Sequence, residues 1–322
     1  MLVSPHLESL LGPMEVGHLT VDDGTQLFYQ LFGDPGGDAV VFANGIGVRY
    51  PGAARQIEAL RPRCRILCWD YRGMGQSVMP DPARGDISMQ RHAHDVLSLL
   101  EHLGLERAIF VGWSMGVQVA LEAIRLQPGR VAGLVALLGT CGRPFQNAFG
   151  GPVAAAVEGL FGLLHRFPAL AQGALDLGVG LPGLTHLVLS KGLFVGADAD
   201  REVFDADVRS VAGVEKALYT RTLLALSDHD AADVLPRVAC PALIIAAERD
   251  YLTPPRVARW MAETIPEASY REVAGGTHFA LIEQTALVNG WLLELVERVY
   301  PAPGAADSAG DAASAARTAA RE

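Results

Sequence analysis

Residues 108–117, Ala-Ile-Phe-Val-Gly-Trp-Ser-Met-Gly-Val, decide the fold of this chain because they place a serine on a sharp turn between two kinds of element. The first four residues are apolar, with β-branched and aromatic side chains, and predict a buried strand. Apolar residues then recur with helical spacing over 117–124. Gly112 and Gly116 allow the strand and helix backbones to approach closely around Ser114. The sequence therefore predicts a serine in a strained conformation, with its hydroxyl above the edge of a sheet.

An acidic residue and a histidine follow Ser114 along the chain, each at the end of a predicted element. Residues 241–246, Pro-Ala-Leu-Ile-Ile-Ala, predict a buried strand, and Asp250 comes just after it, at the edge where open α/β sheets place their sites. His278 lies in a Gly-rich loop that precedes a helical run. A serine needs a base to act as a nucleophile, and a carboxylate orients such a base. We therefore interpret Ser114, Asp250 and His278 as a catalytic triad.

Composition limits the classes of protein to which the chain can belong. Its 322 residues, half of them hydrophobic, suffice for one large domain or a domain with an insertion. The formal net charge of −10, with 26 basic and 36 acidic residues, argues against a nucleic-acid partner. We find neither a secretory signal in residues 1–16 nor an apolar stretch long enough to span a bilayer. The cysteines lack metal-site spacing and predict buried thiols at Cys64 and Cys68, so we expect a reduced, cytoplasmic setting.

Strand-like and helix-like runs alternate along most of the chain. The expected strands are a hairpin within 17–32, then 39–43, 65–69, 108–111, 131–138, 241–246 and 269–273. Further helices are expected over 87–103, with Ser88 as the N-cap, over 254–264 and over 280–299. This alternation implies an α/β fold with a mostly parallel, eight-stranded sheet and helices on both of its faces.

Residues 142–236 interrupt the alternation with short helical runs that Gly and Pro separate. We therefore divide the chain into a core of residues 17–141 and 237–299, a helical cap inserted after the sixth strand over 142–236, and a low-complexity tail, 300–322, expected to be disordered. The insertion is expected to lie over the Ser114 edge of the sheet. Its apolar faces either pack on one another and on the core or line an apolar substrate pocket, and both can hold together.

Several motifs together carry a resemblance to a known family. They are Gly112–Gly116, the loop Asp-Tyr-Arg-Gly-Met-Gly-Gln-Ser at 70–77, Asp250–Pro254, and Gly276–Phe279 with Glu283. From about Gly17 to Val299 the chain resembles the α/β-hydrolase superfamily, specifically its small capped serine esterases and its haloperoxidase-like and C–C-hydrolase-like members. The chain order serine, aspartate, histidine is that of the triad in this fold. The resemblance is specific for fold and triad and says little about the substrate.

The resemblance also implies an oxyanion hole made by the backbone N–H groups of Ile46 and Met115. Relatives usually carry His-Gly where this chain has Asn44-Gly45. The N–H donor of Ile46 does not depend on that side chain, and we expect the Asn44 side chain to hydrogen-bond and hold the loop. A role that needs an imidazole at position 44 is put in doubt.

The resulting hypothesis is a serine hydrolase that cleaves a carboxylic ester or lactone with an apolar moiety through an acyl-serine intermediate. Asn44, Trp113 and Phe279 are candidates for the substrate pocket, although for Trp113 packing beside the site is favoured over contact with substrate. The alternatives are a C–C bond hydrolase or an acyltransferase with the same triad, and a non-catalytic ligand-binding receptor. No Gly-rich dinucleotide motif follows the early strands, so no organic cofactor is implied, and no metal is expected. The oligomeric state stays open.

Two other groups of polar residues receive structural interpretations. His92, His94 and His102 belong to the helix expected over 87–103, and we expect them on a solvated face and not in a metal site. Arg72 is expected to form an ion pair with Asp70 or another nearby acid in preference to binding a substrate carboxylate.

Overall fold

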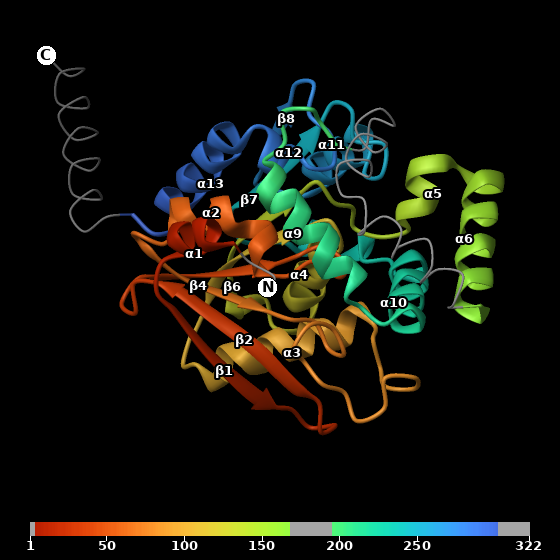
Figure 1. The fold of residues 1–322 in the computed structure, drawn as a ribbon. Coiled ribbons are helices and arrows are strands. Elements are labelled where there is room, and N and C mark those ends of the chain that lie inside the picture. The colour runs from red at the N-terminus through yellow and green to blue at the C-terminus, as the bar shows by residue number, and fades with distance from the viewer. Residues whose placement is uncertain (1–3, 168–194, 302–322) are drawn as a thin grey trace, which may run out of the picture.

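The computed structural model describes residues 4–167 and 195–301. They form one sheet of eight strands with helices packed around it (Figure 1). The strand order is β1-β2-β4-β3-β5-β6-β7-β8; the pairs β1–β2 and β2–β4 are antiparallel, and all other neighbouring pairs are parallel. The strands are Met14–Thr20 (β1), Gln26–Gly33 (β2), Asp38–Ala43 (β3), Cys64–Trp69 (β4), Ala108–Trp113 (β5), Val131–Leu137 (β6), Ala242–Ala247 (β7) and Ala268–Val273 (β8). The predicted eight-stranded, mostly parallel α/β sheet is confirmed.

Helices cover both faces of the sheet, and the sheet separates the apolar core into two clusters. Helices α1 (Pro5–Leu11), α2 (Ala54–Leu60) and α13 (Thr285–Val299) pack on one face, and α3 (Met89–His102), α4 (Met115–Leu126) and α11 (Pro255–Thr264) on the other. Figure 1 shows α1, α2 and α13 grouped on one side of the sheet and α3 on the opposite side. Every residue of β5, β6 and β7 is buried, because both faces of these central strands are covered.

The ends of the helices follow the chemistry of their capping residues. The predicted N-cap Ser88 is confirmed, since its hydroxyl accepts a hydrogen bond from the backbone N–H of Arg91 at 3.2 Å. Helix α1 was not among the expected elements. Ser4 caps it and Pro5 occupies its first position, but with seven residues it is too short for a convincing helical period. The run expected as one helix over 280–299 is divided at Gln284 into α12 (Ala280–Glu283) and α13.

A helical insert follows β6, as the sequence predicts. Its described helices are α5 (Pro144–Phe149), α6 (Gly151–Arg166), α9 (Arg201–Ala212) and α10 (Lys216–Asp228), and the 3₁₀ helix η3 (Ala232–Arg237) leads on to β7. An isolated bridge between Gly142 and Asp230 brings the two ends of the insert together. We keep 142–236 as the proposed limits of a cap.

Three remaining expectations concern the tail, the cysteines and the membrane. From residue 302 onward the tail expected to be disordered lies outside the described residues. Cys64 and Cys68 are buried free thiols, as predicted, and burial raises the pKa of the Cys64 thiol to about 11. Within residues 4–167 and 195–301, no helix is both long enough and apolar enough to cross a membrane.

Candidate active site

Ser114 lies on the turn between β5 and α4 in a backbone conformation, φ 54° and ψ −115°, that residues other than glycine rarely adopt. The flanking glycines make this turn possible. A Cβ added to Gly116 would lie 1.9 Å from the carbonyl oxygen of Ala43 in β3, and one added to Gly112 would lie 2.5 Å from the backbone of Gly116. Strain of this kind costs about 1–3 kcal/mol and persists where the surrounding fold imposes it.

The structure brings Ser114, Asp250 and His278 together at the carboxyl edge of the sheet. His278 Nε2 lies 3.1 Å from Ser114 Oγ, and His278 Nδ1 lies 2.8 Å from Asp250 Oδ2. Asp250 follows β7 and His278 follows β8, so parallel strands deliver both side chains to the edge at which Ser114 turns. Asp250 is 2 % exposed and His278 is 7 % exposed. The hydrogen bonds therefore form one continuous chain from a buried carboxylate to the serine hydroxyl.

Asp250 is held in its ionised form by its surroundings. Burial disfavours the charge, but the positive character and hydrogen bond of His278, together with the hydrogen bonds of Thr253, outweigh burial, so the pKa of Asp250 lies below its ordinary value. Its Oδ1 accepts from the backbone N–H groups of Leu252 and Thr253, both at 2.9 Å, and the Thr253 hydroxyl donates to Oδ2 at 2.5 Å. An ionised carboxylate at this position favours the His278 tautomer with a proton on Nδ1 and a free Nε2.

Two glutamates fix the loop that carries the histidine. Glu283 Oε2 accepts from the backbone N–H of Thr277 at 2.9 Å, and its Oε1 accepts from the backbone N–H of Gly196 in the insert at 2.5 Å. On the other side of the loop, Glu248 Oε2 accepts from the N–H of Gly275 at 2.8 Å. Glu283 was already part of the sequence motif, whereas Glu248 had no recognisable pattern. Glu283 thus joins the histidine loop to the insert.

The two residues expected to supply the oxyanion donors are Met115, which follows Ser114, and Ile46, in the loop after β3. Met115 is the first residue of α4, where the helix N-terminus presents its backbone N–H and a partial positive charge. Ile46 belongs to the loop after β3, which passes close to the serine: a Cβ added to Gly45 would lie 3.5 Å from Ser114 Cβ. Ile46 and Ser114 line the same cavity, and the role of both N–H groups as oxyanion donors stays a prediction.

The loop after β3 is held differently from what the sequence led us to expect. The Asn44 side chain is buried, and neither its amide nitrogen nor its oxygen has a hydrogen-bond partner among the described residues. The backbone carbonyl of Asn44 instead accepts from the hydroxyl of Tyr71 at 2.8 Å. Farther along, Arg49 Nη2 pairs with Asp70 Oδ2 at 2.8 Å. The expectation that the Asn44 side chain holds the loop is wrong.

An apolar cavity of about 320 Å³ opens above Ser114. The insert supplies much of its wall, which contains Pro144, Phe145, Ala148, Phe161, Val211, Tyr219, Leu223 and Leu226. From the core come Gly45, Ile46, Val48, Trp113, Ser114, Leu252, Thr253, His278 and Phe279. Two of the candidate pocket residues, Trp113 and Phe279, are in this wall, and Asn44 is not. The helical spacing of the insert shows that it has apolar faces, but not which face meets the cavity.

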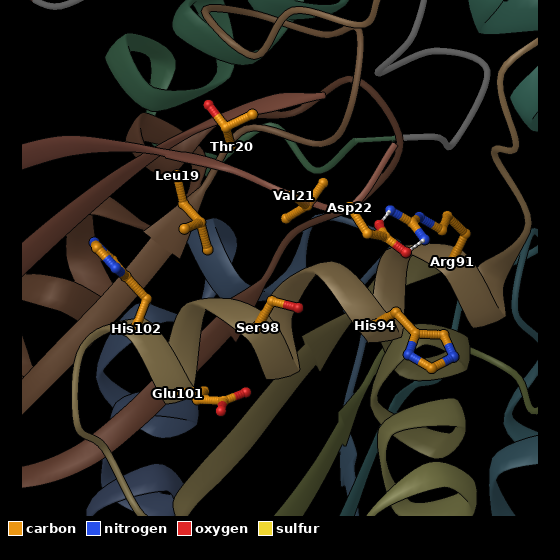
Figure 2. A pocket seen from close by; sticks show the side chains of 9 residues that line it. All are labelled: Leu19, Thr20, Val21, Asp22, Arg91, His94, Ser98, Glu101 and His102. Atoms are coloured by element: carbon orange, nitrogen blue, oxygen red, sulfur yellow. Dashed lines mark hydrogen bonds and ion pairs between the residues drawn. The ribbon is translucent and has the colours of Figure 1, made fainter. Parts of the chain in front are cut away.

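A second cavity, of about 400 Å³, lies between β1 and α3 and has a more polar lining (Figure 2). Arg91 on α3 forms an ion pair with Asp22 across it. His102 is the last residue of α3, and Figure 2 shows His94 well apart from it along the helix, so these polar groups do not converge on one point. The described residues contain no group of three or more His, Cys, Asp or Glu side chains that could hold a metal ion.

His92 and Arg72 lie inside the fold. His94 and His102 are exposed as expected, but the solvated position expected for His92 is wrong: its side chain is fully buried against the ring of Tyr71, and burial lowers its pKa to about 3. Arg72 is also buried and pairs with Asp95, whose Oδ2 lies 2.7 Å from its Nε, and not with Asp70. The expected structural ion pair of Arg72 is confirmed with this different partner.

Comparison with known proteins finds relatives in sequence and in fold. Residues 40–291 match the family described as "Alpha/beta hydrolase family". The chain is 28% identical over 271 residues to 3-oxoadipate enol-lactonase 1 of Acinetobacter baylyi, which covers 83% of this chain and 91% of the relative. Among solved structures, the enol-lactonase of Burkholderia xenovorans superposes with a TM-score of 0.70 at 24% identity, and a bromoperoxidase of Bacillus anthracis with 0.71 at 22%. These alignments cover 87% and 88% of this chain, and 99% and 100% of those structures.

Proposed function

The chain belongs to the alpha/beta hydrolase family, and from this premise we propose that it hydrolyses a carboxylic ester or lactone with an apolar moiety through an acyl intermediate on Ser114. One observation carries the proposal: the hydrogen-bonded series from Asp250 through His278 to Ser114 ends at the floor of an apolar cavity. The helical insert, as a cap over that floor, would supply the substrate's apolar surroundings.

In the first half of the reaction, His278 Nε2 takes the proton of the Ser114 hydroxyl while Oγ attacks the carbonyl carbon of the ester. The carbonyl oxygen becomes an oxyanion. Collapse of this intermediate breaks the bond to the alcohol oxygen, which leaves with the proton that His278 carried. Asp250 keeps the imidazole oriented and stabilises its positive charge without accepting the proton.

In the second half, His278 removes a proton from water, and the resulting hydroxide oxygen attacks the acyl carbon bound to Ser114. The second intermediate collapses to a carboxylic acid, and the proton returns to Ser114 Oγ. In both halves the oxyanion accepts hydrogen bonds from the N–H groups of Ile46 and Met115. Each such donor is worth about 10²–10³ in turnover, because it is fixed before the charge appears.

The cavity supports a substrate with an apolar part of moderate size. Its wall is formed mostly by aliphatic and aromatic side chains from the insert, such as Phe145, Phe161 and Leu223. Burying an alkyl chain there is favourable by roughly 0.8 kcal/mol per methylene group. Relatives named as enol-lactonases support a lactone as one form of the substrate.

A chain-length series of p-nitrophenyl esters tests the proposal directly. We expect the wild type to hydrolyse these esters with an optimum chain length that reflects the cavity of about 320 Å³. Ser114→Ala should lose turnover. A fluorophosphonate label should add once to the wild type by intact mass and not to Ser114→Ala. Ser98→Ala, which changes a serine of the second cavity on α3, is the matched control and should keep both label and turnover.

The same experiment separates this function from the alternatives. Labelling without turnover of any ester or lactone would refute ester hydrolysis and leave acyl transfer, C–C cleavage or ligand binding with the same triad. An acyltransferase would be recognised when an added alcohol captures the acyl group far above its molar share. If neither labelling nor turnover occurs, the assignment of Ser114 as the nucleophile is wrong.

A further inference from the structure

Asp207 in helix α9 is a buried carboxyl group to which the proposed reaction assigns no role. The residue is 3 % exposed, and neither of its carboxyl oxygens has a hydrogen-bond partner among the described residues. One helical turn later, the buried hydroxyl of Ser210 also lacks a partner there. Burying polar groups without hydrogen bonds is costly, so a buried unpartnered carboxyl calls for an explanation beyond packing.

The position of Asp207 on α9 relates it to the cavity above Ser114. Phe204, Asp207 and Val211 are spaced by three and four residues and therefore lie on one face of the helix. The ring of Phe204 contacts the ring of Phe279, a cavity residue, with centroids 5.4 Å apart, and Val211 itself lines the cavity. Asp207 lies between Phe204 and Val211 on this face of α9.

The atoms nearest to the carboxyl show how close it is to the cavity. A Cβ added to Gly52, in the 3₁₀ helix η1 (Tyr50–Ala53), would lie 2.5 Å both from Asp207 Oδ1 and from Cγ1 of Val48. Val48 is a wall residue of the cavity. The carboxyl and the Val48 side chain therefore lie close together, and both occupy space that a side chain at residue 52 would need.

The same surroundings determine the chemical form of the carboxyl. Burial raises the pKa of Asp207 well above its ordinary value. Burial therefore favours the protonated, neutral form of the carboxyl, which offers both an O–H donor and a carbonyl acceptor. A neutral carboxyl of this kind matches an uncharged ligand group that can accept or donate a hydrogen bond.

We propose that Asp207 forms a polar subsite at the wall of the substrate cavity and selects substrates that carry a hydroxyl or keto group on their apolar chain, away from the bond that is cleaved. The inference rests on the proposed function and adds the substrate class to it. A rotamer change of Val48 brings the ligand group and Asp207 into contact. The hydroxyl of Ser210 lies one turn farther along α9 and can share the same ligand group.

Matched pairs of esters test this subsite. The probes are p-nitrophenyl butanoate, hexanoate and octanoate with their terminally hydroxylated counterparts. We expect the wild type to favour the hydroxylated member at one chain length by about tenfold in kcat/KM, which corresponds to one net hydrogen bond in a buried site. Asp207→Asn keeps a neutral donor and acceptor and should retain the preference. Asp207→Leu should lose it.

Two further variants make the test specific. Val48→Ala removes the two γ-methyl groups that lie beside the carboxyl and line the cavity, and should increase the preference for the hydroxylated ester. Asp205→Leu changes a partly exposed acid on the same helix and should leave the preference unaltered. Because the wild type already reports the preference, the test does not depend on the folding of any variant.

Binding measurements distinguish failure of this inference from failure of the proposed function. Titration calorimetry with octanoate and 8-hydroxyoctanoate, and with the shorter pairs, compares the same ligands without turnover. A preference that Asp207→Leu abolishes supports the subsite even if no ester is cleaved. Equal affinity and equal kcat/KM within every pair, or a preference that survives in Asp207→Leu, would overturn it.

Discussion

Replacing Gly116 by alanine should damage the turn at Ser114 more than the addition of one methyl group suggests. The new Cβ would lie 1.9 Å from the carbonyl oxygen of Ala43, and real Cβ contacts essentially never fall below 3.0 Å. Helix α4 and strand β3 must therefore separate by about 1.1 Å at this point. A misplacement of about 1 Å costs on the order of 100-fold in rate, and Met115, which would donate to the oxyanion, is the preceding residue. We expect kcat/KM to fall by at least about 100-fold, with a loss of about 1–3 kcal/mol in unfolding free energy.

The assay measures kcat/KM on the best p-nitrophenyl ester together with the urea midpoint of each variant. Gly290→Ala in α13 is the matched control, because a Cβ at that position would meet no atom within 4 Å. This control should keep full activity and gain about 0.5–1 kcal/mol in stability, since alanine favours helices over glycine. A Gly116→Ala enzyme with wild-type kcat/KM would refute the view that the glycine serves the close approach of α4 and β3.

Three other substitutions probe features that surround the site. His92→Gln should reduce the loss of stability at acid pH. The buried imidazole has a pKa of about 3, against an ordinary value of 6.5, so the unfolded chain takes up a proton at a higher pH than the folded one. In urea titrations the wild type should therefore lose unfolding free energy as the pH falls from about 6.5 to about 3, and the variant should not. Glu283→Gln should lower kcat about tenfold with little change in KM, because the amide nitrogen replaces one carboxylate oxygen and cannot accept a hydrogen bond, so the N–H of either Thr277 or Gly196 loses its acceptor. Glu248→Gln, at an exposed carboxylate, should change kcat less than twofold, and equal effects of the two would contradict the link to the insert. Arg72→Met removes both hydrogen bonds that Arg72 donates to the buried Asp95, which then keeps only the longer ion pair with Arg91 at 3.7 Å. It should cost about 3–5 kcal/mol in unfolding free energy, whereas a loss below 1 kcal/mol would show that the pair is dispensable.

The features that the sequence predicts well are those fixed by local chemistry. The turn at Ser114 needs a strand, two glycines and a helix in immediate succession, and all of these are visible in ten residues. The central strands are continuous apolar runs because both of their faces are covered. Asp250 and His278 could be placed because each follows a predicted strand, and parallel strands bring their carboxyl ends to one edge. Each inference relies on neighbours in the sequence or on a topological rule.

The features that the sequence does not predict depend on contacts between distant segments. His92 was expected on a solvated face, yet the ring of Tyr71, from the loop after β4, buries it. The side chain of Asn44 has suitable groups for a hydrogen bond, but it is the backbone carbonyl of Asn44 that accepts one, from the Tyr71 hydroxyl. Asp207 is one of many acids in the chain, and its burial follows from the packing of α9 on η1. Helical spacing identifies an apolar face without naming the surface that the face meets.

The same long-range contacts determine how the insert affects the proposed chemistry. At the end of α10, His229 Nε2 lies 2.7 Å from Glu122 Oε1, and Glu122 belongs to α4, the helix that starts after Ser114. In α9, Phe204 contacts Phe279, the neighbour of His278. The insert is therefore attached to the elements that carry both the serine and the histidine.

Two kinds of position in the insert should consequently behave differently. A side chain such as Leu223 lines the cavity, where it would contact the apolar part of the substrate, so its replacement should alter KM and the preferred chain length while kcat changes little. A side chain such as His229 contacts the helix of Ser114, so His229→Phe should lower kcat for substrates of every chain length. Kinetics of these two variants on one ester series compare the two kinds of position directly. If both variants altered only chain-length preference, the insert would act as a wall of the cavity and not as a support for the reacting groups.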